Sequence, residues 1–383
     1  MASILPHSLQ PDTDALAHSD GLRAEISRAI GEAGGWIGFS RFMEMALYAP
    51  GLGYYSAGAV KLGPGGDFVT APEMTPLFAQ TLAGPVAQAL AGLPPSAVLF
   101  ELGAGSGRLA CDLMLALQER DSLPAQYWIL EVSADLRERQ QAQVATLPSA
   151  LRDRVRWRDT WPEKFSGVVV ANEVLDALPV HRVGWRAEGW VEVGVALEGA
   201  QWVWRERPLC DARLRDALPD PAGWPVPYDT EICLAAADLV ATLAHSLEAG
   251  RAYFFDYGFP AREYYHPQRS MGTLMCHLRH HAHGDPLVYP GLQDITAHVD
   301  FTAVARAALA QGLAVADYGT LAGWLVAAGI TDHLGRLAAD SARYLPAVSA
   351  VQKLLSPAEM GELFKVLELR PAGGPAVLPA RLG

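Results

Sequence analysis

In the middle of the chain, continuous apolar runs alternate with segments in which apolar residues recur at helical spacing. Continuous apolar runs occur at residues 97–102, 127–132 and 167–175, with a weaker one at 154–157. Such runs are typical of strands buried on both faces. Segments with helical spacing follow the first two runs, and Ser133 is a candidate N-cap for the second of them. The alternation predicts a doubly wound, Rossmann-like α/β sheet with parallel strands.

The pattern changes after this region. Residues 181–206 alternate with period two between glycine-containing turns, which predicts an antiparallel β meander inserted into the sheet. Residues 231–250 return to helical spacing. Further elements are expected as strands at 251–258, 313–319 and 362–370, and as a helix at 295–312.

The N-terminal part reads as helices and loops. Residues 22–50 predict a helix, a glycine-rich break and a second helix that stops at Pro50. Residues 51–74 are dense in glycine and look like a loop, and residues 75–92 predict another helix. A loop of that length inside a compact domain is uncommon and often functional.

Composition narrows the class of protein. The chain has 383 residues and a formal net charge of −12, which disfavours nucleic acid as a partner. We expect a cytoplasmic protein without membrane insertion, because no signal or transit peptide and no bilayer-length apolar run is visible. The four cysteines form no C-x-x-C pair, as expected for free thiols in a reducing compartment: Cys111, Cys210, Cys233 and Cys276.

A glycine motif follows the first apolar run, in the stretch FELGAGSGRLA at residues 100–110. Gly103, Gly105 and Gly107 allow a sharp turn and a close approach of the backbone to a ligand. The third glycine of a dinucleotide fingerprint would stand at Arg108, which disfavours an NAD-dependent oxidoreductase. Glu101 suits a cofactor with an amino group and a sulfonium better than a pyrophosphate. A turn without a ligand also accounts for the glycines.

A second acid closes the next strand. Glu131 can accept hydrogen bonds from both hydroxyls of a ribose. This feature is shared by several nucleotide-binding architectures, and a solvated strand end is the alternative.

The spacing E-x-G-x-G-x-G resembles motif I of the class I S-adenosylmethionine-dependent methyltransferases. Four further blocks, at residues 66–74, 171–182, 256–259 and 272–301, resemble the MidA family of that class. The resemblance extends over roughly residues 20 to 370.

The resemblance implies a class I methyltransferase fold with S-adenosyl-L-methionine as cofactor. The mitochondrial member of the family is a complex I assembly factor. For that member, the family implies symmetric dimethylation of an arginine on a complex I subunit. We therefore expect a protein arginine methyltransferase with a protein substrate, such as a complex I subunit. Two alternatives are a methyltransferase of a small molecule or another residue, and a chaperone-like assembly factor with a structural cofactor site.

The pattern of elements predicts a domain layout, and the resemblance adds a set of cofactor contacts. In methyltransferases of this fold, residues such as Asp159 and Thr160 flank the adenine, although both are also ordinary loop residues. The expected layout is a flexible lead at 1–20, a helical and lid region at 21–95, a methyltransferase core at 96–180 and 250–370, an inserted substrate-side subdomain at 181–249 and a tail at 371–383. The expected cofactor residues are Thr70, Glu101, Gly103, Gly105, Gly107, Glu131, Asp159, Thr160 and Asn172.

An arginine substrate requires carboxylates. A guanidinium and a sulfonium at ~4 Å repel by about 4 kcal/mol at an effective dielectric of about 20. Glu173 and Asp176 follow the fourth strand and Asp256 follows the fifth, where α/β sheets bind their ligands. We expect Glu173 and Asp176 to hold the guanidinium, with Asp256 nearby. The alternatives are a helix cap for Asp176 and a strand-end turn for Asp256.

The loop at residues 63–74 carries one of the family blocks, and by analogy it closes over the cofactor. Asp67, Thr70 and Glu73 are candidate contacts, and Tyr55 is a candidate wall of the cleft. Alternatively, Asp67 and Thr70 cap the helix that starts near residue 75.

Clustered histidines and tryptophans each allow two interpretations. His277, His280, His281 and His283 invite a zinc reading, but their spacing fits no metal motif, so we expect no metal. The block instead is expected to line the substrate cleft, or to supply one histidine as a local base, with His281, Gln293 and Asp294 as candidates. The meander's tryptophans form a peptide-binding wall or the meander's own core: Trp185, Trp190, Trp202 and Trp204.

Overall fold

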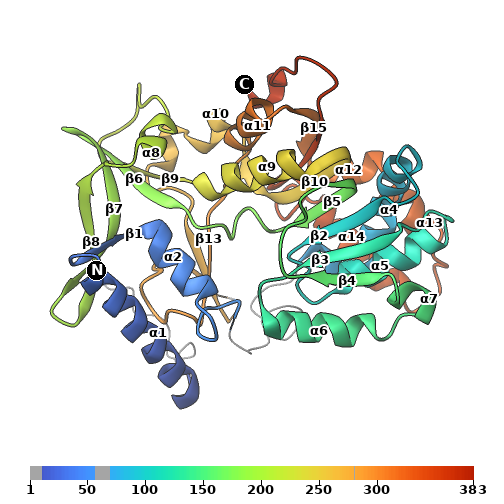
Figure 1. The fold of residues 1–383 in the computed structure, drawn as a ribbon, viewed down its shortest axis with the longest axis horizontal. Helices are drawn as coiled ribbons and strands as arrows, with labels where there is room; N and C mark the ends of the chain where they lie inside the picture. The colour runs from blue at the N-terminus through green and yellow to red at the C-terminus, as the bar shows by residue number, and fades with distance from the viewer. Residues whose placement is uncertain (1–10, 57–69, 280) are drawn as a thin grey trace. The chain divides into compact units, whose positions relative to one another are not determined.

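The computed structural model describes residues 11–56, 70–279 and 281–383 (Figure 1). The chain divides into two units, each assembled from discontinuous segments. Unit 1 is Met1–Phe68, Asp176–Asp238 and Arg262–His298, and unit 2 is Val69–Leu175, Leu239–Ala261 and Val299–Gly383. Within the described ranges, no helix has both the length and the apolar character needed to cross a bilayer.

Unit 2 contains the predicted sheet. Its strand order is β15-β16-β10-β5-β2-β3-β4, and β14 pairs with β10. The five strands from β10 to β4 are parallel, whereas β16 runs antiparallel to both β10 and β15. The doubly wound α/β architecture is thereby confirmed. The strands are β2 (Val98–Leu102), β3 (Gln126–Leu130), β4 (Val155–Arg158), β5 (Phe165–Asn172), β10 (Leu247–Phe259), β14 (Val299–Asp300), β15 (Leu313–Thr320) and β16 (Phe364–Pro371).

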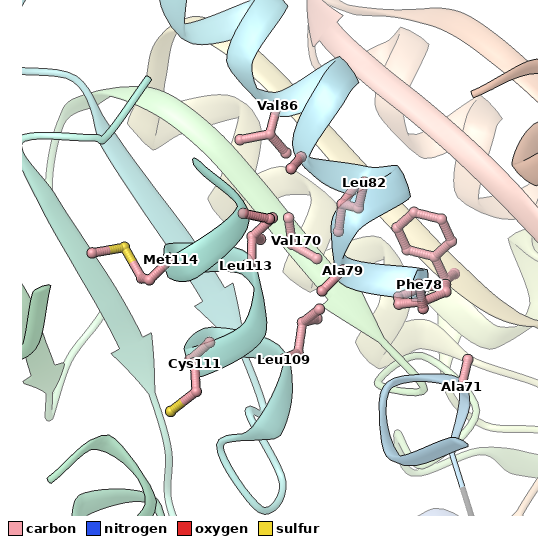
Figure 2. Packing of buried hydrophobic residues seen from close by; sticks show 14 of the residues in the cluster. Ala71, Phe78, Ala79, Leu82, Val86, Leu109, Cys111, Leu113, Met114 and Val170 are labelled. Carbon is pink, nitrogen blue, oxygen red and sulfur yellow. The ribbon is translucent and has the colours of Figure 1, made fainter. Parts of the chain in front are cut away.

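Helices cover one face of this sheet with a continuous apolar core. Leu82 of α4, Leu113 of α5 and Val170 of β5 converge there (Figure 2). The predicted cap is present, because the Ser133 hydroxyl accepts a hydrogen bond from the Leu136 amide at 3.2 Å. The helices of unit 2 are α3 (Ala71–Met74), α4 (Pro76–Ala91), α5 (Arg108–Gln118), α6 (Ala134–Val144), α7 (Ser149–Arg152), α11 (Phe301–Ala310), α12 (Leu321–Ala327), α13 (Ile330–Gly335), α14 (Tyr344–Leu355) and the 3-10 turn η3 (Ala380–Leu382).

Unit 1 contains the predicted meander. Strands β6, β7 and β8 are antiparallel neighbours, and β1 and β9 extend the sheet. A second sheet has the order β12-β11-β13. The elements are α1 (Thr13–Glu32), β1 (Trp36–Gly38), α2 (Phe39–Tyr48), β6 (His181–Arg186), β7 (Gly189–Glu198), β8 (Gln201–Pro208), α8 (Ala212–Asp216), β9 (Tyr228–Ile232), η2 (Pro267–Arg269), β11 (Met275–Leu278), β12 (His281–His283) and β13 (Asp294–Thr296). Helices α9 (Leu234–Ser246) and α10 (Ala261–Tyr264) carry the chain across the division between the units.

Two of the meander's tryptophans lie in the core of unit 1. Trp202 packs edge-on against Phe42 with 5.3 Å between ring centroids, and Trp204 packs against Phe39 at 5.4 Å. Trp185 and Trp190 pack against each other at 5.6 Å. These contacts favour the core interpretation over a peptide-binding wall.

Several expected elements are corrected by tertiary pairing. The helix expected at 231–250 is instead the end of β9, then α9, then the start of β10, because β9 pairs with β6 and β10 pairs with β5. The helix expected at 295–312 begins only at Phe301, since the residues before it form β13 and β14.

The expected lead, core and tail boundaries also shift. Residues 13–20 are helical, with Asp12 capping α1 by accepting from the Ala15 amide at 2.9 Å. The segment 262–298 belongs to unit 1, where Ile295 is buried in the same core as α1 and α2. Leu382 in the expected tail is fully buried, and its carbonyl accepts a hydrogen bond from the Thr302 hydroxyl at 2.6 Å.

Candidate cofactor site

The glycine turn lies between β2 and α5 in unit 2. Gly103, Gly105 and Gly107 have φ values of 60°, 53° and 82°, a region that side-chain-bearing residues rarely adopt. At Gly107, an added Cβ would also come within 3.2 Å of the Gln140 Cα. The sharp turn predicted from the spacing is therefore present, and it needs glycine for both conformation and space.

Glu101 lies in front of this turn with only 3% of its surface exposed. The Tyr127 hydroxyl donates a hydrogen bond of 2.7 Å to its Oε2. Burial raises the pKa of Glu101 to about 7, against the opposing effect of the Tyr127 hydrogen bond. The acid thus has a partner inside unit 2, and its contact with a cofactor amino group stays a prediction.

Glu131 is held on both of its carboxylate oxygens. Oε1 accepts from the Ser133 amide and Oε2 from Gln140 Nε2, each at 2.9 Å. The same Gln140 nitrogen donates to the Gly105 carbonyl at 3.0 Å, and Trp157 Nε1 donates to Gln140 Oε1 at 2.9 Å. Gln140 therefore ties the glycine turn, Glu131 and strand β4 together.

Sequence reasoning missed Gln140 and Trp157, although one signal was available. The buried residues of α6 are Leu136, Gln140 and Val144, at a spacing of four. A polar residue in the middle of a buried helical stripe must find internal hydrogen-bond partners, so its position alone marks it for inspection.

Asn172 and Glu173 end strand β5. Asn172 Nδ2 donates to Glu173 Oε1 at 3.3 Å, while Asn172 Oδ1 is buried and has no hydrogen-bond partner among the described residues. Glu173 has a φ of 53°, and its amide donates to the Phe255 carbonyl at 2.9 Å. Such a conformation at a residue other than glycine is often found at functional sites.

Asp256 binds backbone amides at the end of β10, and its expected place near a guanidinium stays a prediction. It is 1% exposed, and its Oδ2 accepts from the amides of Val174 at 3.1 Å and Leu175 at 2.7 Å. Its Oδ1 accepts from the Tyr257 amide at 3.0 Å. Burial raises the pKa of Asp256 to about 8, and the Glu173 charge raises it as well. With both oxygens occupied, Asp256 fixes the turn that carries Glu173, which is the strand-end role left open by the sequence.

The remaining unit 2 candidates lie on loops and on α3. Asp159 and Thr160 are exposed, and Asp159 pairs with Arg137 at 2.6 Å. Thr70 precedes α3 but makes no side-chain cap, and Thr75 caps α4 instead. Glu73 accepts a hydrogen bond from the Ser106 hydroxyl, so α3 contacts the glycine turn. Ser106 was missed because it occupies a variable position of the motif, and Asp67 lies outside the described residues.

In unit 1, Tyr55 and Asp294 form a pair. The Tyr55 hydroxyl donates to Asp294 Oδ1 at 2.9 Å, and burial together with the Asp294 charge raises the pKa of Tyr55 well above its ordinary value. Gln293 is fully buried, and its amide donates to the carbonyls of Val288 at 2.6 Å and Pro286 at 3.0 Å. Gln293 therefore holds its own loop together, and its place beside the substrate cleft stays a prediction.

Asp176 and the histidine block complete unit 1. The Asp176 carbonyl accepts from the Ala297 amide at 3.0 Å. Unit 1 resumes at Asp176, directly after Leu175 of unit 2, so its pairing with Glu173 stays a prediction. His281 is exposed, and its Nδ1 lies 2.8 Å from the Arg279 carbonyl oxygen. Among the residues that the structure describes, which omit His280, no cluster of three or more His, Cys, Asp or Glu side chains could hold a metal.

Known proteins identify the family. Residues 81–319 match the family model described as "Putative S-adenosyl-L-methionine-dependent methyltransferase". The chain belongs to this methyltransferase family. It is similar to a crystal structure from Burkholderia thailandensis bound to S-adenosyl-homocysteine, with a TM-score of 0.90, 49% identity and coverage of 97% of each chain. The MidA-type resemblance, the class I fold and S-adenosylmethionine as cofactor are thereby confirmed.

Two curated relatives carry a more specific name. The Drosophila melanogaster "Protein arginine methyltransferase NDUFAF7 homolog, mitochondrial" is 30% identical, with 96% of this chain and 89% of the relative covered. The Danio rerio "Protein arginine methyltransferase NDUFAF7, mitochondrial" is 28% identical, with 87% of this chain and 83% of the relative covered.

The residues of unit 2 fit the cofactor. The three glycines of the turn present backbone without side chains, Glu131 presents a hydrogen-bonded carboxylate, and Asn172 Oδ1 is buried without a hydrogen-bond partner among the described residues. The bound cofactor supplies an electrophilic methyl group. The protein supplies the orientation of that group and the placement of charge around it.

Proposed function

We propose that this methyltransferase acts on an arginine side chain of a partner protein. The proposal rests above all on the Drosophila relative, which is named an arginine methyltransferase and is similar over 96% of this chain. A complex I subunit is the proposed partner and symmetric dimethylarginine the proposed product, in line with the family resemblance in the sequence. The cytoplasm is the proposed location.

The chemistry at the end of β5 supports this choice. Transfer to arginine brings a guanidinium close to a sulfonium, so the site needs a carboxylate in a fixed position. Glu173 is such a group, because the amides that follow it are held by Asp256 and its own amide is held by Phe255. A carboxylate on a fixed turn can align the attacking nitrogen without paying for reorientation.

The test uses isotopically labelled S-adenosylmethionine. The full chain is incubated with protein extract from cells that lack the gene, and labelled dimethylarginine is sought by mass spectrometry. The expected result is one labelled arginine site that is also methylated in normal cells. Label recovered in small molecules or in other residues would instead support the first alternative. S-adenosyl-homocysteine binding without any transfer would support an assembly factor.

Glu173→Gln tests the residue assignment. The variant is expected to bind S-adenosyl-homocysteine within a few-fold of the parent and to lose at least about 100-fold in turnover, since a lost charge contact to the transition state is worth several kcal/mol. Glu163→Gln, at an exposed position of the same unit, is the matched control. Turnover of Glu173→Gln equal to that of the control would remove Glu173 from the site.

A further inference from the structure

The side-chain amide of Gln140 is buried, and both of its polar atoms have hydrogen-bond partners. It is 0% exposed, so it touches no solvent. Its two polar atoms make three hydrogen bonds, of 2.9, 3.0 and 2.9 Å, to Glu131, Gly105 and Trp157. These partners come from three different segments that follow or form strands β2, β3 and β4.

The arrangement constrains the amide to one orientation. Nε2 faces two acceptors, the Glu131 carboxylate and the Gly105 carbonyl, while Oε1 faces the indole N–H of Trp157, which is a donor only. A reversed amide would set oxygen against oxygen at two contacts. All three partners therefore select the same end of Gln140 to meet Glu131.

We propose that Gln140 is a positioning residue for the cofactor, which locks the Glu131 carboxylate and the Gly105 carbonyl in the relation that the ribose and the glycine turn require. The proposal rests on Glu131 as the predicted ribose ligand and does not depend on which substrate is methylated. A fixed carboxylate binds the two ribose hydroxyls without first losing conformational freedom.

The charges around Glu131 support the same role. Burial raises the pKa of Glu131, whereas the hydrogen bonds from Ser133 and Gln140 and the charge of Arg137 oppose that rise. Arg137 is itself paired with Asp159. Glu101 is a further acid in the surroundings, and the charge of Glu131 raises its pKa. Gln140 thus favours the ionised carboxylate, which is the better acceptor for hydroxyl groups.

The experiment measures the dissociation constant of S-adenosyl-homocysteine by calorimetry between pH 6 and pH 9. Gln140→Leu should weaken binding by about 10- to 100-fold at pH 7, the usual effect of removing a hydrogen bond to a charged group. In turnover assays, this variant should show a raised KM for S-adenosylmethionine and a kcat within about threefold. Gln141→Leu, at an exposed position of the same helix, is the matched control and should bind like the parent.

Two variants of Gln140 should show opposite pH trends. The loss in Gln140→Leu should shrink as the pH rises, because Glu131 then ionises without help. The loss in Gln140→Glu should grow with pH, because two neighbouring carboxylates share a proton at low pH and repel when both ionise. Glu101 is present in the parent and in every variant, so each loss is taken as the ratio to the parent at the same pH. A purely structural defect would give losses that do not depend on pH.

Two further variants keep the outcome decisive. Glu131→Gln should weaken binding at least about tenfold. Trp157→Phe should weaken binding by a smaller factor, because it removes one of the three hydrogen bonds to the Gln140 amide and leaves the amide in place. Weak binding by Glu131→Gln together with parent-like binding by Gln140→Leu would overturn the proposal. So would losses in both Gln140 variants that stay constant with pH. If Gln140→Leu does not fold, Trp157→Phe and Gln140→Glu provide the test.

Discussion

At the scale of single residues, the buried acid Glu101 makes the stability of unit 2 depend on pH. Its pKa is raised to about 7 by burial, from an ordinary value of 4.5. The folded state therefore binds this proton more tightly than the unfolded state. The resulting stabilisation is complete below pH about 4.5 and is lost as the pH rises through about 7.

Glu101→Gln isolates this effect, because the amide does not titrate. Relative to that variant, the parent should lose up to about 3 kcal/mol of unfolding free energy between pH 4.5 and pH 7. Urea unfolding of both proteins at several pH values measures the difference. A difference that is the same at pH 5 and pH 8 would contradict a raised pKa.

The sequence predicted the residues whose role depends only on the local backbone. The glycine turn and the Ser133 cap follow from local backbone needs, so the spacing alone indicated them. Gln140 and Asp256 were different, because their roles depend on partners that only the fold brings together. Asp256 was expected near the guanidinium, with a strand-end turn as the alternative, since a carboxylate that binds backbone amides looks the same in sequence as one that binds a ligand.

At the scale of elements, the turn between β2 and α5 should tolerate no side chain at Gly107. Gly107→Ala would place a Cβ at a φ of 82° and within 3.2 Å of the Gln140 backbone. We expect a loss of at least about 1 kcal/mol in stability from the backbone strain. Binding of S-adenosyl-homocysteine should also fall, because the turn must shift away from α6. Thermal unfolding and calorimetry measure the two effects.

The matched control is Gly335→Ala in α13 of the same unit. Nothing lies within 4 Å of the added Cβ, and alanine is the better helix former, so this change should be neutral or stabilising by up to about 1 kcal/mol. If the two substitutions had the same effect, the left-handed turn would not be required.

Element types were predictable where the buried pattern is local. The apolar runs at 97–102 and 167–175 became β2 and β5, since a strand covered on both faces needs apolar residues throughout. The prediction of one helix over residues 231–250 was wrong at both ends, because β9 pairs with β6 and β10 pairs with β5 on either side of α9. Gly250 illustrates the reason: it has a φ of 133°, and an added Cβ would lie 1.7 Å from the Gly167 carbonyl oxygen.

At the scale of the whole molecule, the local pattern predicted an inserted subdomain at 181–249, but not which segments make up each of the two units. The chain passes from one unit to the other five times, after Phe68, Leu175, Asp238, Ala261 and His298. The segment 262–298 joins unit 1 through burial of Cys276, Ile295 and Ala297 beside α1 and α2. Such long-range contacts depend on the assembled core, so no spacing in the sequence predicts them.

The two cores predict that the cofactor stabilises the units unequally. The main core of unit 2 and the core around α1 and α2 in unit 1 share no residue. The glycine turn and Glu131 belong to unit 2, so S-adenosyl-homocysteine at 100 times its Kd should stabilise that unit by about 2.7 kcal/mol. Amides in β5 and β10 that exchange only through unfolding of unit 2 should then exchange about 100-fold more slowly. Amides in β7 of unit 1 should slow by less than about threefold, because opening unit 1 leaves the ligand bound. Hydrogen exchange followed by mass spectrometry resolves these strands. Equal slowing of β5 and β7 would show instead that the five chain crossings bind the two cores into one cooperative unit.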